Sequence, residues 1–495
     1  MSKQRRARFA VIPLVALVAV ASLATAAGAS TPGPARGGSS GKKPNIVLIL
    51  TDDLDRTLYL DPSRYPKVNS LLVEQGTTFS NYFVTDSLCC PSRSSLLRGQ
   101  YVHNHDVRSN KPPLGGFEKF HTNGDEKSTI ATWMHDAGYR TGLLGKYLNG
   151  YPNGADATFV PPGWDVWASP VRNGGYSEYN YQLNENGTLV PHGANPQDYL
   201  TDVLSQKSGE FIQQSGDKPF FLYVAPFVPH APATPAPRYA DAFPGVQAPR
   251  TESFNQADVS AEPKWLRDRP VLNDQQIGSI DALYRKQLQS MLAVEDLIEH
   301  VVDTLRQTRQ LDNTYIVLTS DNGFHLGQHR LPQGKITPFE EDIRVPLVVR
   351  GPGAPAGKKV EDFAANVDLA PTFAKLGAAK APDFVDGRSL ETVFRGKASD
   401  DPRKDVLVEQ FTGGAGQRAG RRGGAPPTYA AVRTDRYTYV EYVTGERQLY
   451  DLRTDPDQLH NVVSTADPKL VQDLAKQLSA LQKCKGSGCR VADRG

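Results

Sequence analysis

Four short, continuous apolar runs constrain the fold of this 495-residue chain more than any other feature. Two of them, residues 45–50 and 314–319, lead directly into polar and acidic side chains. Runs of this length with β-branched residues are typical of strands that are buried on both faces of a parallel sheet. Residues 220–225 and 345–350 have the same character. The sequence therefore predicts a sheet that is covered on both sides.

The segments between these runs carry helical patterns. Residues 128–137 begin at a serine that can cap a helix, and they stop before Gly138. Residues 279–311 place apolar side chains at helical spacing: Leu288, Met291, Leu292, Leu297, Ile298, Val301, Val302 and Leu305. Strands that alternate with helices predict an α/β sandwich with a mostly parallel central sheet.

The chain changes character after about residue 403. Short stretches rich in tyrosine alternate in polarity, and a helical pattern follows them: residues 406–410, 429–433, 437–442, 448–451 and 468–481. This predicts a smaller C-terminal antiparallel sheet with a helix. We therefore expect a main α/β domain over residues 44–402 and an α+β subdomain over residues 403–495. The Gly/Arg-rich stretch 413–427 is expected to form a surface loop.

The N-terminus has the pattern of an export signal. Basic residues up to Arg8 precede an apolar run over residues 9–27, and small residues follow. A membrane anchor is the alternative, because a run of this length reaches across a bilayer. However, the run is rich in alanine, contains Pro13 and ends without a charged stop. We expect a signal peptide over residues 1–29, a flexible linker over 30–43, no stable membrane span and a secreted mature protein.

The charge balance argues against nucleic acid as a partner. The chain has 56 basic and 54 acidic residues, but the export signal holds four of the basic ones and none of the acidic ones. The remainder is close to neutral. A broad cationic face is therefore not expected, and an anion would have to be bound by a few local cations.

Acidic and amide side chains follow two of the apolar runs. Asp52 and Asp53 come after the first run, and Asp321 and Asn322 come after the other. In open α/β sheets, ligands bind at the carboxyl ends of the strands. Oxygen donors of this kind suit Ca²⁺ or Mg²⁺ rather than zinc. Each pair alone is also explained by a turn after a strand, but two pairs in matched positions favour a divalent-cation site.

Residues 87–99 form the most specific stretch of the chain. Pro91 suits the first turn of a helix and Gly99 suits its end, so Cys89 and Cys90 are expected at a helix N-terminus. Backbone N–H groups at that position favour an anion, and Arg93 adds a positive charge. A buried or disulfide-bonded cysteine pair is the alternative interpretation. An unpaired thiol in an exported chain nevertheless needs an explanation.

The pattern Cys89-x-Pro-Ser-Arg93, followed by a helix and a glycine, resembles the signature of type I, formylglycine-dependent sulfatases. Residues 138–146 resemble the second signature of that family. The metal pattern of the family falls on the oxygen donors named above: Asp52, Asp53, Asp321 and Asn322. Within the family, the chain is most similar to the N-acetylglucosamine-6-sulfatase branch over nearly all of its mature length. The resemblance implies a sulfatase/alkaline-phosphatase-like sandwich, with residues 44–402 as the catalytic domain.

The resemblance also implies a mechanism. A formylglycine-generating enzyme would convert Cys89 to formylglycine, whose hydrated aldehyde would bind one Ca²⁺, with Mg²⁺ as the alternative, and attack the sulfur of a sulfate ester. The second hydroxyl on the same carbon would then allow sulfate to leave. Arg93 would hold the diol, and Lys146 and Lys335 would bind sulfate oxygens. His230 would donate a proton to the leaving alcohol.

One departure from the family pattern concerns the base for sulfate release. Many sulfatases carry a histidine two residues after the signature lysine, where this chain has Leu148, followed by Asn149. The same pattern in the N-acetylglucosamine-6-sulfatase branch supports that branch but leaves the base unassigned. His325 is our first candidate. Three further histidines are weaker candidates for the site: His103, His105 and His329.

The expected substrate is the 6-O-sulfate of N-acetylglucosamine or a related sulfated glycan. The segment 150–193 is rich in aromatic residues that could stack on sugar rings or pack the loop onto the fold: Trp164, Trp167, Tyr176, Tyr179 and Tyr181. The sequence does not choose between these roles. Cys484 and Cys489 are expected to form a small C-terminal disulfide loop, consistent with export.

Two other functions remain open. A phosphonate or phosphate monoester hydrolase could use the same fold, because the tetrahedral anions are alike and some phosphonate hydrolases also use formylglycine. A secreted, non-catalytic protein could bind sulfated glycans through Ca²⁺, which requires Cys89 to remain a thiol.

Overall fold

The computed structural model describes residues 42–56, 61–172, 174–412 and 425–495. Residues 43–495 form one compact unit. The expected signal peptide, residues 30–41 of the expected linker and residues 413–424 of the Gly/Arg-rich loop lie outside the described residues. Within the described ranges, no helix combines the length and the apolar character that a bilayer crossing requires.

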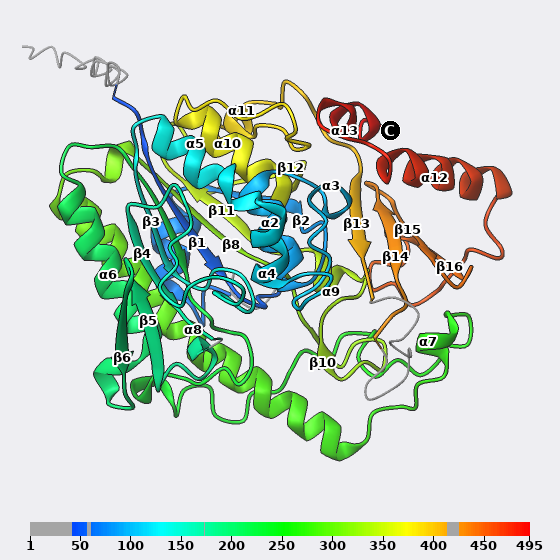
Figure 1. The fold of residues 1–495 in the computed structure, drawn as a ribbon. Coiled ribbons are helices and arrows are strands. Elements are labelled where there is room, and N and C mark those ends of the chain that lie inside the picture. The colour runs from blue at the N-terminus through cyan, green and yellow to red at the C-terminus, as the bar shows by residue number, and fades with distance from the viewer. Residues whose placement is uncertain (1–41, 57–60, 173, 413–424) are drawn as a thin grey trace, which may run out of the picture. The chain divides into compact units, whose positions relative to one another are not determined.

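In the described part of the chain, ten strands form a central sheet (Figure 1). They are β1 (Asn45–Thr51), β2 (Thr77–Phe83), β3 (Arg140–Gly145), β4 (Val166–Pro170), β5 (Tyr181–Glu185), β6 (Thr188–His192), β7 (Phe220–Ala225), β8 (Thr314–Ser320), β11 (Leu347–Arg350) and β12 (Lys358–Ala365). Their order is β12-β2-β11-β8-β1-β7-β3-β4-β5-β6. The central strands β8, β1, β7, β3 and β4 are parallel, whereas β11, β5 and β6 pair antiparallel with their neighbours. The predicted mostly parallel sheet is confirmed.

The register of the two central strands brings their polar ends together. β1 and β8 pair along their whole length, from Asn45 opposite Thr314 to Thr51 opposite Ser320. Every residue of both strands is buried, as their continuous apolar sequences predict. The segments that leave β1 and β8 therefore start side by side at the same edge of the sheet.

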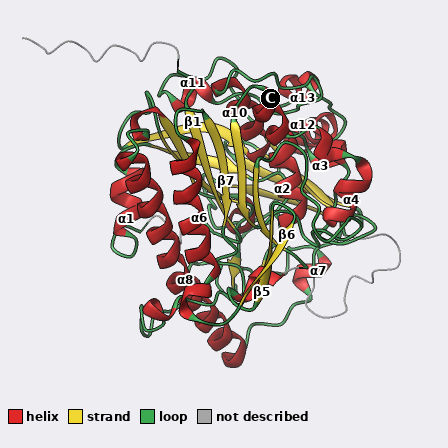
Figure 2. Cartoon of the chain, turned by 60° about the vertical axis from the view of Figure 1, so that its left-hand side comes forward, coloured by secondary structure: helices red, strands yellow, loops and turns green. Residues whose placement is uncertain are grey.

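Helices cover both faces of this sheet. The helices that precede the C-terminal sheet in the chain are α1 (Pro66–Val68), α2 (Cys89–Arg98), α3 (Val102–His105), α4 (Gly116–Asn123), α5 (Ile130–Asp136), α6 (Leu200–Ser215), α7 (Lys264–Arg267), α8 (Asp274–Gln307), α9 (Glu340–Ile343), α10 (Leu369–Leu376) and α11 (Glu391–Phe394). Alternate side chains of β1 divide between two cores: Leu48 packs in the core that includes α2, α5 and α10, and Ile49 packs in the core that includes α6 and α8. Figure 2 shows α6 and α8 running beside each other along one face of the sheet.

Two predicted elements differ from the structure in instructive ways. The predicted strand 345–350 is β11, but it runs antiparallel to both β8 and β2. The long helix α8 begins five residues before the predicted start. Its first turn is capped by Asn273, whose side chain accepts a hydrogen bond from the Gln276 N–H at 2.9 Å. This cap lies before the apolar periodicity on which the prediction depended.

The C-terminal sheet follows its prediction closely. Its strands β13 (Val406–Gln410), β14 (Tyr429–Arg433), β15 (Tyr437–Tyr442) and β16 (Arg447–Asp451) pair antiparallel in chain order. Two helices follow, α12 (Pro468–Leu481) and α13 (Ser487–Ala492). The core of this region also includes Phe83, Tyr101 and Ile343 of the larger part, so the two sheets belong to one compact unit.

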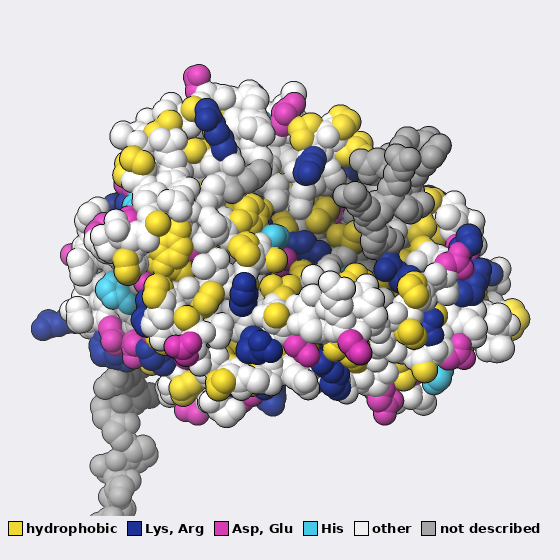
Figure 3. Space-filling model, turned by 90° about the horizontal axis from the view of Figure 1, so that it is seen from below, with side chains coloured by type: hydrophobic (Ala, Val, Ile, Leu, Met, Phe, Trp, Pro, Cys, Tyr) yellow, Lys and Arg dark blue, Asp and Glu magenta, His cyan; other side chains and the backbone are white. Residues whose placement is uncertain are grey.

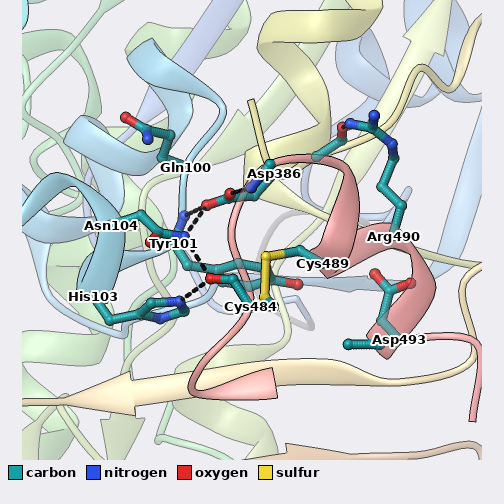
Figure 4. Close-up of a disulfide and its surroundings, with 12 residues drawn as sticks. Gln100, Tyr101, His103, Asn104, Asp386, Cys484, Cys489, Arg490 and Asp493 are labelled. Carbon is teal, nitrogen blue, oxygen red and sulfur yellow. Dashed lines mark hydrogen bonds between the residues drawn. A yellow bond between two sulfur atoms is a disulfide. The ribbon is translucent and has the colours of Figure 1, made fainter. Parts of the chain in front are cut away.

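A disulfide closes a small C-terminal loop that lies against α3, the helix that follows α2 (Figure 4). Cys484 and Cys489 are bonded, as expected. The backbone oxygen of Cys484 accepts hydrogen bonds from His103 Nε2 at 2.9 Å and from Asn104 Nδ2 at 3.1 Å. Asn104 Nδ2 also donates to Asp386 at 2.8 Å. The loop between the two cysteines is thereby held against α3.

Candidate active site

Four adjacent parallel strands, β8, β1, β7 and β3, end at one edge of the sheet and carry most of the candidate side chains. The segments that follow them supply six of these side chains: Asp321 and Asn322 after β8, Asp52 and Asp53 after β1, His230 after β7, and Lys146 after β3. Figure 3 shows the molecule from below, where a histidine and several basic side chains lie in a hollow of the surface. The side chains that follow these strands therefore lie together at the sheet edge that the apolar runs predicted.

The predicted oxygen donors lie together and are buried. The Asp53 N–H donates to Asp321 Oδ1 at 3.2 Å, and Asn322 Nδ2 donates to Asp53 Oδ1 at 2.7 Å. Asp53 adopts a left-handed backbone conformation, with a φ of 67°, which aspartate tolerates better than most residues. This conformation turns the chain directly after β1 and keeps both aspartates that follow the strand in the cluster.

Cys89 is the first residue of α2, as predicted, and the helix ends at Gly99 with a φ of 66°. Its Sγ lies 3.4 Å from Asp52 Oδ1 and 2.7 Å from Lys335 Nζ. Burial and the nearby Asp52 raise the pKa of Cys89 to about 12. The unmodified thiol is therefore protonated at neutral pH and is a poor nucleophile.

Lys146 reaches the cluster from the end of β3. It forms an ion pair with Asp52 and is almost completely buried. Burial would raise the pKa of Asp52, but Lys146 and other nearby cationic groups lower it to about 2. The preceding Gly145 has a φ of 106°, and a Cβ there would lie 2.1 Å from the backbone oxygen of Ala225 on β7. Only glycine fits at this position. The close approach of β3 to β7 therefore fixes the backbone position from which the Lys146 side chain extends.

Lys335 approaches from the opposite side on a small hairpin of β9 (His325–Leu326) and β10 (Gln333–Gly334). It forms an ion pair with Asp53, and its side chain is only 13% exposed. Burial would lower its pKa, but Asp53 and Cys89 raise it well above the usual value. The next residue, Ile336, has a φ of 76°, which is strained for a β-branched residue, and its N–H donates to the Ser87 backbone oxygen at 3.2 Å. Lys335 is thus held beside the start of α2.

Arg93 connects three parts of the site from within α2. Its Nε donates to Asp321 Oδ2 at 2.7 Å, and its Nη1 donates to the backbone oxygen of Lys146 at 3.0 Å. Both members of the Arg93–Asp321 pair are 0% exposed. The same guanidinium leaves its buried Nη2 without a hydrogen-bond partner among the described residues. This donor is available for a ligand oxygen.

His230 lies on the loop after β7 and faces Asp53. Its Nε2 is 3.6 Å from Asp53 Oδ2, and its Nδ1–H donates to the backbone oxygen of Ala231 at 2.6 Å. With Nδ1 engaged as a donor, Nε2 is the nitrogen that can accept and release a proton. The side chain is 25% exposed, so an incoming ligand can reach it.

The other candidate histidines have partners of their own. His325 Nδ1 lies 3.0 Å from both carboxylate oxygens of Asp342, and His325 pairs with Gly334 beside Lys335. The three weaker candidates contact other parts of the fold: His103 binds Glu409, His105 binds Ser95, and His329 binds Gln256. His325 therefore lies on the β9–β10 hairpin that precedes Lys335. Of the candidate histidines, His230 is the one in the cluster around Cys89.

The residues of the cluster fit a divalent cation. The ligand atoms of Asp52, Asp53, Cys89 and His230 lie within 4.8 Å of one another. Asn322 Oδ1 is buried and has no hydrogen-bond partner in the described part of the chain. Carboxylate and amide oxygens of this kind suit a hard cation, and an orphaned amide oxygen beside buried carboxylates is a free ligand for one.

Comparison with known proteins identifies the family. Residues 44–379 match the family model described as sulfatase, and residues 327–484 match the C-terminal model of N-sulphoglucosamine sulphohydrolase. The chain belongs to the sulfatase family. It is 38% identical to the N-acetylglucosamine-6-sulfatase of Homo sapiens over 91% of this chain and 86% of that protein. These matches support a sulfuric ester hydrolase.

Solved structures agree with the fold of this sulfatase. A protein in complex with its substrate D-glucosamine-2-N,6-O-disulfate superposes with a TM-score of 0.76 at 23% identity, covering 89% of this chain and 98% of that one. A phosphonate monoester hydrolase from Silicibacter pomeroyi superposes with a TM-score of 0.69 at 24% identity, covering 88% and 93%. The predicted sulfatase/alkaline-phosphatase-like sandwich is confirmed.

The structure shows which aromatic residues of the segment 150–193 pack within the fold and which lie beside the candidate site. Trp164 and Trp167 pack in the main core, Tyr181 stacks on His192, and Tyr179 contacts Tyr199. Among the described residues, Tyr176 alone of the five contacts candidate site residues, His230 and Lys146. It lies on a short 3-10 helix, η3 (Gly174–Ser177), and its hydroxyl accepts a hydrogen bond from Asn149 Nδ2 at 3.0 Å. No periodic signal marks such a residue in the sequence.

Proposed function

We propose that this sulfatase hydrolyses the 6-O-sulfate of N-acetylglucosamine or of a related sulfated glycan, using formylglycine at position 89 and one divalent cation. The observation that carries the proposal is the position of the Cys89 side chain. It lies at a helix N-terminus, 3.4 Å from Asp52 and 2.7 Å from Lys335. A residue in this place is adjacent both to a cation site and to groups that bind an anion. The high thiol pKa disfavours chemistry by the unmodified cysteine.

The cation would be held by side chains that end the strands: Asp52, Asp53, Asp321, Asn322 and residue 89 in its modified form. Family membership and the all-oxygen donor set favour Ca²⁺, with Mg²⁺ as the alternative. When bound, the cation supplies Lewis-acid polarisation and a fixed charge beside the sulfate ester. Asp52 and Asp53 stay ionised for this role because their pKa values are lowered.

The chain's own cations would bind and orient the sulfate. Lys146 and Lys335, which form ion pairs with Asp52 and Asp53, would bind the sulfate oxygens as positive charges at the edge of the cation site. Arg93 would stay on Asp321, which leaves its unpartnered Nη2 as a donor for the oxygen carried by residue 89. Residue 89, oxidised to an aldehyde and hydrated, supplies the oxygen that attacks sulfur as the S–O bond to the alcohol breaks.

His230 would protonate the leaving alcohol. Its Nδ1–H is fixed on Ala231, so the proton that moves is held at Nε2. A sugar alkoxide is a poor leaving group, and this proton makes its departure feasible. His325, oriented by Asp342, remains our candidate for the base that acts in sulfate release.

The proposal also covers the roles of the two parts of the chain and the secretion of the protein. Residues 44–402 would form the catalytic domain and residues 403–495 a supporting subdomain. Secretion after cleavage of residues 1–29 is consistent with the Cys484–Cys489 disulfide, because disulfides persist in oxidising compartments. A formylglycine-generating enzyme would have to act on residue 89 before α2 is buried by folding.

The test is release of inorganic sulfate by protein that is coexpressed with a formylglycine-generating enzyme. We expect turnover of 6-O-sulfated N-acetylglucosamine, and a loss of roughly a hundredfold or more in kcat/KM in Lys335→Ala. Lys375→Ala is the matched control, because Lys375 is an exposed lysine on α10. Sulfate release that is unaffected by Lys335→Ala would contradict the proposed site.

A phosphonate monoester hydrolase is the second candidate, since a protein of that activity shares this fold. Paired aryl sulfate and aryl phosphonate esters with the same leaving group distinguish the two. Higher kcat/KM for the phosphonate would replace the sulfatase proposal.

A further inference from the structure

Tyr176 joins two groups that the proposed mechanism uses separately. Its ring centroid lies 4.6 Å from the ring centroid of His230, with the planes inclined by 51°. The Lys146 ammonium lies 5.1 Å from the same ring centroid, within the range of a cation–π contact. One aromatic side chain therefore contacts both the proposed sulfate-binding lysine and the proposed proton donor.

The position of Tyr176 is itself fixed from two sides. Phe227, at the start of the loop that carries His230, meets the Tyr176 ring edge-on at a centroid distance of 5.0 Å. Asn149, three residues after Lys146, donates to the Tyr176 hydroxyl at 3.0 Å. Leu148, which precedes Asn149, is buried in the main core instead. The segment after the signature lysine thus reaches the site through Asn149 and Tyr176.

His230 needs such support. It lies on a loop rather than on a strand or helix, and its Nδ1 is held only by the backbone oxygen of its neighbour Ala231. Its Nε2 lies 3.6 Å from Asp53 Oδ2, which is too long for a hydrogen bond, so the nitrogen contacts alone do not fix the plane of the ring. A packed aromatic ring against one face restricts the tilt and fixes the direction of Nε2.

We propose that Tyr176, held by Asn149, is a positioning residue that aims His230 Nε2 at the oxygen of the leaving alcohol. This inference rests on the proposed sulfatase function. It predicts that replacing Tyr176 lowers kcat most for substrates whose leaving group must be protonated. A nitrophenolate leaves without assistance, whereas a sugar alkoxide does not.

The experiment compares 6-O-sulfated N-acetylglucosamine with nitrophenyl sulfate in the fully matured enzyme. For Tyr176→Leu we expect kcat for the sugar sulfate to fall by about 30- to 100-fold, with KM changed by no more than about threefold. The fall with nitrophenyl sulfate should be about tenfold smaller. Tyr176→Phe keeps the ring and should recover most of the sugar-sulfate activity. The matched control is Tyr179→Leu, since Tyr179 packs on Tyr199, and it should not change the ratio of the two activities.

A double mutant separates positioning from structural damage. In a His230→Ala background, Tyr176→Leu should cause no further selective loss, because there is no imidazole left to aim. Equal losses on both substrates, or a full additional loss in the His230→Ala background, would overturn the inference while leaving the sulfatase function intact. If Tyr176→Leu does not fold, Tyr176→Phe and Asn149→Ala give the same substrate comparison with smaller losses. Failure of the wild-type enzyme to release sulfate from either substrate would overturn both proposals.

Discussion

The buried ion pair between Arg93 and Asp321 makes a quantitative prediction about stability. Both side chains are 0% exposed, and Nε and Oδ2 are 2.7 Å apart. Burial alone would lower the pKa of Arg93, but the Asp321 carboxylate raises it, so the pair is charged. Arg93→Met leaves that carboxylate buried without its partner, which costs about 3–5 kcal/mol, and the Lys146 backbone oxygen loses a donor worth about 1 kcal/mol.

The assay is denaturant-induced unfolding at neutral pH with a chelator present, so that no bound cation offsets the lost charge. Arg494→Met is the matched control, because Arg494 and Asp401 are also 2.7 Å apart but are 56% and 31% exposed. That variant should lose no more than about 1 kcal/mol. The double variant Arg93→Met/Asp321→Asn should lose clearly less free energy of unfolding than the sum of the losses in the two single variants. A loss in Arg93→Met as small as in the control, or strict additivity in the double mutant, would refute the reasoning.

Three further predictions concern other parts of the molecule. Ca²⁺ at a hundred times its dissociation constant should stabilise the chain by about 2.7 kcal/mol in calorimetry or denaturant unfolding, and Asp53→Asn should remove most of this gain, whereas an unchanged gain would exclude the strand-end site. Burial raises the pKa of Glu178 to about 8 from its usual value of 4.5, so its contribution to stability is complete below pH 4.5 and is lost as the pH rises through 8. Between pH 4.5 and 8, the free energy of unfolding should therefore depend less on pH in Glu178→Gln than in the wild type. An equal pH dependence in the two proteins would contradict this prediction. Replacing Cys484 and Cys489 by serine opens a loop with a sequence separation of 5 and should lower the free energy of unfolding by about 2 kcal/mol, with faster hydrogen exchange in α3; no change in exchange there would contradict the contact through His103 and Asn104.

The centre of the fold could be read from the sequence because its signal is local. β1, β7 and β8 are uninterrupted apolar runs, and the polar residues after β1 and β8 mark where the strands end. Burial on both faces requires that pattern, so the pattern identifies the strands. The short strands β13–β16 were predictable from a different local signal, the alternating polarity of tyrosine-rich stretches.

The edges of the sheet and half of the site could not be read in this way. β12 carries charged residues such as Lys358 and Glu361 because one edge faces solvent, so it shows no continuous apolar run. Lys146 and Lys335 look like ordinary loop lysines, and only the family resemblance identified them. Tyr176 reaches the site because the chain folds back between β4 and β5, a tertiary event that no local pattern records.

The central claim is that residue 89 of the active protein is formylglycine. Mass spectrometry of the peptide that spans residues 87–93, from protein whose sulfatase activity has been measured, tests it directly. The account predicts that sulfur and two hydrogens are replaced by one oxygen at position 89, in a fraction that rises in step with specific activity across preparations. Fully active protein in which Cys89 is an unmodified thiol would contradict it.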